Sequence, residues 1–180
     1  MLVLDDKGIF IPTFLAVFIH ELAHIAAVRI YGGTIERIDV RVFGIRVNVP
    51  ELRFLPYKKE IIIAAAGPIA GIATAIVSAL AADLFGLKNA DYFVGINIVI
   101  TAINLIPVFP LDGGRMVLSL LLLNFSVRAA YVISYILNIL SVSAWFSLCV
   151  ILALRGVLNP SLVIFSAYVA FCGIRLCPLR

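Results

Sequence analysis

Residues 9–31 read IFIPTFLAVFIHELAHIAAVRIY, an apolar run with a cluster of ionisable residues in its second half. A helix rises about 1.5 Å per residue, so about 20 apolar residues cross the hydrocarbon core of a bilayer. Gly32 and Gly33 follow the run and favour its end. This stretch predicts a membrane-spanning helix with a polar cluster along its length.

The composition supports the same interpretation. Of 180 residues, 63% are apolar and 13% are charged, with a mean hydropathy of +1.15. A soluble domain is nearer half apolar and a quarter charged, so lipid must cover part of this chain. No Lys/Arg-rich block is present, which argues against a nucleic-acid partner. Because Asp5 and Asp6 precede the first apolar run, we expect no cleaved signal peptide.

Further apolar runs follow along the chain. Together with the first run they predict five full spans, the later ones at 61–84, 93–109, 129–154 and 161–176. Residues 116–123 are too short to span and predict a half helix. Residues 34–49 alternate apolar and polar side chains around Phe43-Gly44, which predicts a β-hairpin. The expected fold class is an all-α polytopic membrane protein with one small β-hairpin, forming a single membrane-embedded domain over 1–180.

Basic residues predict the orientation. Half of the 14 Lys and Arg residues lie between His24 and the second predicted span, and more follow at the C-terminus. Positive charges favour the cytoplasmic side. We therefore expect a multi-pass protein of the cell membrane, with the N-terminus outside and both the hairpin and the C-terminus cytoplasmic.

His20-Glu21-Leu22-Ala23-His24 is an HExxH motif. Residues four apart lie on one face of a helix, so both imidazoles can reach one metal ion. Glu21 lies beside them and can take a proton from an activated water. The alternative is a polar seam between helices or a proton path. Ionisable groups in a membrane are costly, by at least about 2.5 kcal/mol for a charge near a helix centre, and metal ligation gives each group a partner.

Catalytic zinc sites use three protein ligands and leave one position open. Asp112 is the best candidate for the third ligand, because it lies in a Pro- and Gly-rich break after the third predicted span, on the side that the topology predicts to be cytoplasmic. Irregular backbone at membrane depth is tolerated where it lines a cavity. An ordinary Asp-Gly turn at the membrane interface is the alternative. The cofactor we expect is Zn²⁺, one ion per chain, since His, His and Asp with an open position suit zinc best.

Three motifs together resemble the site-2 protease family of intramembrane zinc metalloproteases: the HExxH span, Ala66-Gly67-Pro68, and the later NxxPxxPLDG stretch over 104–113. The layout is nearest to the compact bacterial stage IV sporulation protein FB type. The resemblance implies that His20, His24 and Asp112 bind zinc and that Glu21 is the general base. One departure is Gly71, where many members carry an asparagine.

The resemblance also implies a substrate-positioning or oxyanion role for Asn104, for which helix packing is the alternative. Pro107 and Pro110 of the same stretch are expected to contact substrate. The strand residues Val40 and Val42 are expected to hold an extended substrate through main-chain hydrogen bonds; the alternative is a hairpin that only caps the bundle.

The resulting functional hypothesis is an intramembrane zinc endopeptidase acting in regulated intramembrane proteolysis. Its expected partners are the lipid bilayer, a membrane-embedded or membrane-associated protein substrate such as a sigma-factor precursor, and regulatory membrane partners. Two alternatives stay open. One is an inactive relative that binds membrane partners, and the other is a transporter with a polar path, for which an inverted repeat is expected but not found.

Overall fold

The computed structural model describes residues 10–32, 37–41, 44–48, 56–86, 90–156 and 166–167; of the two strands it describes the backbone. The chain forms two compact units, residues 1–104 and 105–180.

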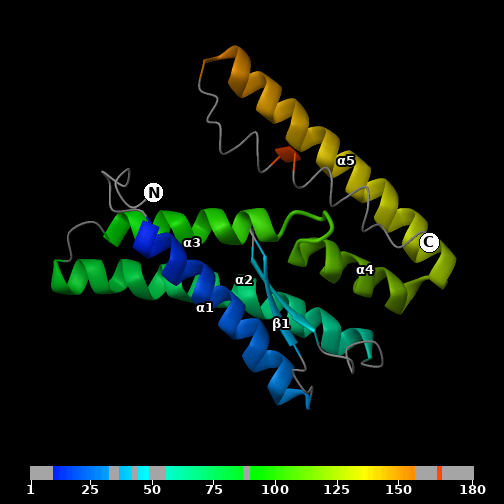
Figure 1. The fold of residues 1–180 in the computed structure, drawn as a ribbon, viewed down its shortest axis with the longest axis horizontal. Coiled ribbons are helices and arrows are strands. Elements are labelled where there is room, and N and C mark those ends of the chain that lie inside the picture. Colours follow the sequence, from blue (N-terminus) through cyan, green and yellow to red (C-terminus); the bar gives the residue numbers. More distant parts are fainter. Residues whose placement is uncertain are drawn as a thin grey trace. The chain divides into compact units, whose positions relative to one another are not determined.

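The first unit is a bundle of three helices. They are α1 (Phe10–Ile30), α2 (Tyr57–Phe85) and α3 (Ala90–Asn104), and each packs against the other two (Figure 1). Pro12 is tolerated in the first turn of α1, where its missing N–H has no partner to lose. Gly86 ends α2 in the left-handed conformation, and its N–H donates to the carbonyl of Ala82.

Strands β1 (Arg37–Arg41) and β2 (Gly44–Asn48) pair antiparallel, from Arg37 opposite Asn48 to Arg41 opposite Gly44. In the first unit, β2 lies beside α1. The predicted complete β-hairpin over 34–49 is nevertheless not supported, because its connecting residues 42–43 and its outer ends lie outside the described residues. The described residues are mostly helical, with five helices.

The second unit contains α4 (Asp112–Asn124) and α5 (Val127–Leu154), which pack against each other. Helix α4 begins directly after the Pro-rich segment 105–111. Helix α5 begins after Ser126, whose hydroxyl accepts a hydrogen bond from the Ala129 N–H at 3.4 Å. Only residues 125–126 separate the two helices, so α4 and α5 are adjacent both along the chain and in the second unit.

The distribution of polar groups is that of a membrane protein. His20, His24, Asn97 and Thr101 are buried, whereas large apolar side chains face outward. Ile76 of α2, for example, is 56% exposed. Water would penalise such an apolar exterior, and lipid does not. Among the described residues, α1, α2 and α5 are long and apolar enough to cross a membrane.

The prediction of five full spans is wrong for the described part of the chain. Helix α3 has only 15 residues and ends at Asn104, although the apolar run continues to residue 109. Pro107 and Pro110 explain the difference, because proline lacks a donor and disfavours helical backbone in the residue before it. The last predicted span, 161–176, lies outside the described residues apart from 166–167. The predicted half helix is longer than expected and forms α4.

Candidate metal centre

Two buried histidines on α1 form the core of the candidate site. His20 is 3% exposed and His24 is 8% exposed. Their spacing of four residues puts both rings on one face of the helix. The two Nε2 atoms lie 3.2 Å apart, and the rings meet edge to face with centroids 4.9 Å apart. The two imidazoles therefore lie on one face and close together, while their role as metal ligands stays a prediction.

A contact with α2 fixes the proton on His24. Its Nδ1 lies 2.7 Å from the backbone carbonyl oxygen of Ile63. A carbonyl oxygen can only accept, so Nδ1 carries the hydrogen and Nε2 keeps a lone pair. Metal-binding histidines commonly donate their second ring N–H to such an oxygen, which sets the tautomer and the ring orientation. The sequence held no signal for Ile63, because its side chain plays no part in this contact.

Gly67 of α2 faces the same two rings. A Cβ atom built on Gly67 would lie 2.6 Å from His20 Nε2 and 2.7 Å from His20 Cε1, and it would also collide with His24 Nε2. Glycine at this position therefore leaves room in front of both nitrogens. The motif Ala66-Gly67-Pro68 drew attention to this residue, but its contact with the imidazoles could not be read from the sequence.

The two nitrogens fit a zinc ion. Two nitrogen ligands at about 2.0–2.1 Å in a tetrahedral site are about 3.3 Å apart, close to the observed Nε2–Nε2 separation. Two neutral imidazoles are also the donors that zinc favours at a buried position. The residues present therefore fit the metal.

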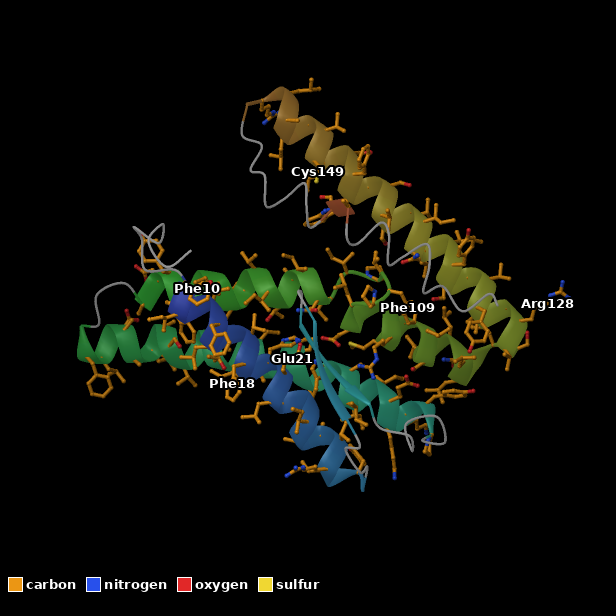
Figure 2. All side chains as sticks on the ribbon, in the orientation of Figure 1. Phe10, Phe18, Glu21, Phe109, Arg128 and Cys149 are labelled. Atoms are coloured by element: carbon orange, nitrogen blue, oxygen red, sulfur yellow. The ribbon has the colours of Figure 1, made fainter. Side chains whose placement is uncertain are left out.

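Glu21 follows His20 in the middle of α1, one turn beyond Phe18 (Figure 2). Glu21 is half-buried, so it is neither fully enclosed between helices nor fully exposed. Consecutive helical residues are rotated by about 100°, which puts Glu21 on the face next to the histidines. Its role as general base stays a prediction.

Asn104 is the last residue of α3, in the same unit as the histidines. Its amide Nδ2 donates to the carbonyl of Ile100 at 3.1 Å. This local bond uses one of the hydrogen-bonding groups of the amide. It neither requires nor contradicts contact with substrate, and the role of Asn104 remains a prediction.

The other predicted ligand belongs to the second unit. Asp112 is buried and is the first residue of α4. A helix N-terminus favours a carboxylate because the first N–H groups lack helical partners. The guanidinium of Arg115 lies 3.9 Å from Asp112 Oδ1, which is a long ion pair. Asp112 therefore has surroundings that suit an ionised ligand, and its role as the third ligand stays a prediction.

The remaining predicted site residues are less defined. Pro107 and Pro110 are half-buried in the segment that precedes α4. Val40 lies in β1, and Val42 lies outside the described residues. Contact of these four residues with a substrate is untested.

Several known proteins are similar to this chain. A zinc metalloprotease of Methanocaldococcus jannaschii is 30% identical over 170 residues, which cover 91% of this chain and 47% of that protein. Stage IV sporulation protein FB of Bacillus subtilis is 32% identical over 127 residues, covering 69% of this chain and 43% of that protein. The chain thus spans about half the length of these curated relatives.

The solved structure of a site-2 protease from Methanocaldococcus jannaschii has the same fold. It superimposes with a TM-score of 0.70 at 24% identity, covering 95% of this chain and 78% of that one. No family model matches the sequence.

Proposed function

We propose that this chain is a member of the site-2 protease family and that it acts as an intramembrane zinc endopeptidase. The observation that carries the proposal is the buried histidine pair. His24 Nδ1 donates to the Ile63 carbonyl, and both Nε2 atoms converge at 3.2 Å. Two histidines held in this way inside a membrane span are costly unless they serve a metal. The transporter and the inactive relative gain no support from relatives that are named as proteases.

The proposed ligand set is His20, His24 and Asp112, which hold one zinc ion per chain. When bound, zinc supplies Lewis-acid activation of a water molecule and of a peptide carbonyl oxygen. One carboxylate and two neutral imidazoles neutralise only part of the charge of Zn²⁺. The site would therefore keep a net positive charge, which favours the developing oxyanion.

Glu21 is the proposed general base. Its carboxylate accepts a proton from the attacking water while the hydroxyl oxygen bonds to the peptide carbonyl carbon. It then delivers that proton to the departing amide nitrogen as the C–N bond breaks. The proposed role of the Asn104 amide is to hold the substrate backbone or the developing oxyanion, with Pro107 and Pro110 beside the extended substrate.

Residues 1–180 are proposed to act as one membrane-embedded protease domain with the N-terminus outside and the C-terminus cytoplasmic. The proposed substrate is a membrane-embedded or membrane-associated protein. The likeness to a sporulation protein makes a sigma-factor precursor the first candidate to test, together with membrane partners that regulate access.

Hydrolysis can be tested with the detergent-purified chain and a panel of fluorescently labelled single-span peptides. We expect wild type to cut at least one peptide into two fragments in a chelator-sensitive reaction. Glu21→Gln should keep its zinc and lose roughly 10²- to 10⁴-fold in rate, the range for loss of a general base. Retained turnover in Glu21→Gln would exclude this residue as the base. A zinc-loaded wild type that cuts none of the peptides, in detergent or in vesicles, would contradict the protease assignment.

A further inference from the structure

Within the segment 105–111 that leads into α4, residues 107–111 contain only three backbone donors, and each of the three has an acceptor. Pro107 and Pro110 have no N–H. The Val108 N–H donates to Ile106 O at 2.7 Å, and the Leu111 N–H donates to Val108 O at 2.8 Å. These two bonds are internal to the segment. They leave the N–H of Phe109 as the donor that must find its acceptor elsewhere.

Asn138 of α5 supplies that acceptor. Its Oδ1 accepts a hydrogen bond from the Phe109 N–H at 3.1 Å, although the two residues are 29 positions apart. Asn138 is 3% exposed, in a helix whose outward side chains are mostly apolar. Figure 2 labels Phe109 in the segment before α4. Where water is scarce, an unpaired N–H is costly, so this side chain is a specific anchor for an irregular backbone.

The anchored segment is also packed tightly against the first turn of α4. A Cβ built on Gly113 would lie 2.6 Å from Ile106 O and would also collide with Leu105 O. One built on Gly114 would lie 2.7 Å from the Val108 carbonyl carbon and 2.8 Å from Phe109 N. The segment therefore cannot shift without moving the residues that follow Leu111, and the first of these is Asp112.

From this chain of contacts we infer that Asn138 is a positioning residue: by accepting the Phe109 N–H, it fixes the segment 105–111 and thereby the carboxylate of Asp112. The inference rests on the proposed function, in which Asp112 is the third zinc ligand. In this inference Asn138 acts through the Phe109 N–H and not through contact with the metal or the substrate. Partners of metal ligands typically change metal affinity by about 10- to 100-fold when they are removed.

The test compares zinc affinity, measured by competition with a chromophoric chelator, in three α5 variants of the full chain. Asn138→Leu removes the acceptor at similar volume. Asn138→Asp keeps an acceptor oxygen at the same place. Ser134→Ala, one turn earlier and also buried, is the control for disturbing the interior side of α5. We expect a loss of roughly 10- to 100-fold in Asn138→Leu, with Asn138→Asp and Ser134→Ala within about threefold of wild type.

Equal zinc affinity in folded Asn138→Leu and wild type would overturn the inference, as would equal losses in the Leu and Asp variants. If Asn138→Leu does not fold, amide hydrogen exchange of the wild-type protein tests whether the Phe109 N–H is held by Asn138. A peptide covering 107–111 has only three backbone amides because of its two prolines, and protection of Phe109 comparable to α5 supports the anchor. Rapid exchange at Phe109 excludes it. Exchange can be read whether or not the protein cleaves peptides, so failure of the protease assignment stays distinguishable.

Discussion

Gly67→Ala adds one methyl group directly in front of both candidate zinc ligands. The new Cβ would lie 2.6 Å from His20 Nε2, whereas non-bonded heavy atoms are comfortable at about 3.5–4.0 Å. The overlap is therefore about 1 Å. His24 cannot retreat without losing the 2.7 Å bond from its Nδ1 to Ile63 O. Both rings must move, and with them the nitrogen lone pairs.

The size of the effect follows from the cost of overpacking. An extra methyl group in a well-packed interior costs about 1–3 kcal/mol. If that cost falls on the metal-bound state, zinc affinity drops by about five- to 150-fold, since 1.4 kcal/mol corresponds to a factor of ten. In an open position the same substitution should help, because alanine favours a helix over glycine by about 1 kcal/mol. The sign of the effect therefore separates a steric cause from a helix-propensity effect.

Gly95→Ala in α3 is the matched control, because a Cβ built there meets no atom within 4 Å. Zinc affinity by chelator competition and thermal unfolding in detergent are the two measurements. We expect weakened zinc binding in Gly67→Ala, and unchanged zinc binding with equal or higher stability in Gly95→Ala. A folded Gly67→Ala protein with wild-type zinc affinity would refute the idea that this glycine makes room for the metal.

Two other substitutions test separate parts of the account. Asp112→Asn should weaken zinc affinity by roughly 10-fold or more, because it replaces an anionic ligand by a neutral amide. Unchanged zinc occupancy would mean that the third ligand is a different residue. Gly71→Ala should lower the free energy of unfolding by about 1–3 kcal/mol, because its Cβ would collide with the buried hydroxyl of Thr101. Thr101→Ala in the same chain should restore most of that loss, and thermal unfolding without such restoration would locate the strain elsewhere.

The sequence was most informative where one helix carries the whole signal. The bounds of α1 and the shared face of His20 and His24 follow from an apolar run and a four-residue spacing, both of which are local properties of a helix. The start of α4 was predicted less well, because the apolar run placed the half helix at 116–123 and the helix begins four residues earlier, at Asp112.

Contacts between elements could not be predicted in the same way. The approach of Gly67 to the imidazoles and the bond from His24 to Ile63 O depend on how α2 is rotated against α1, which spacing along either helix does not determine. The bond from Phe109 to Asn138 joins residues 29 positions apart on different elements, and no local sequence pattern links them. The third span was predicted too long because its apolar run continues past the end of the helix at Asn104.

The most direct test of the central claim is the zinc content of the detergent-purified chain, measured by elemental analysis beside a folded His24→Ala variant. The account predicts about one zinc per wild-type chain and almost none in the variant, because His24 supplies one of three protein ligands. A correctly folded wild type without bound metal, or a His24→Ala protein that keeps its zinc, would contradict it.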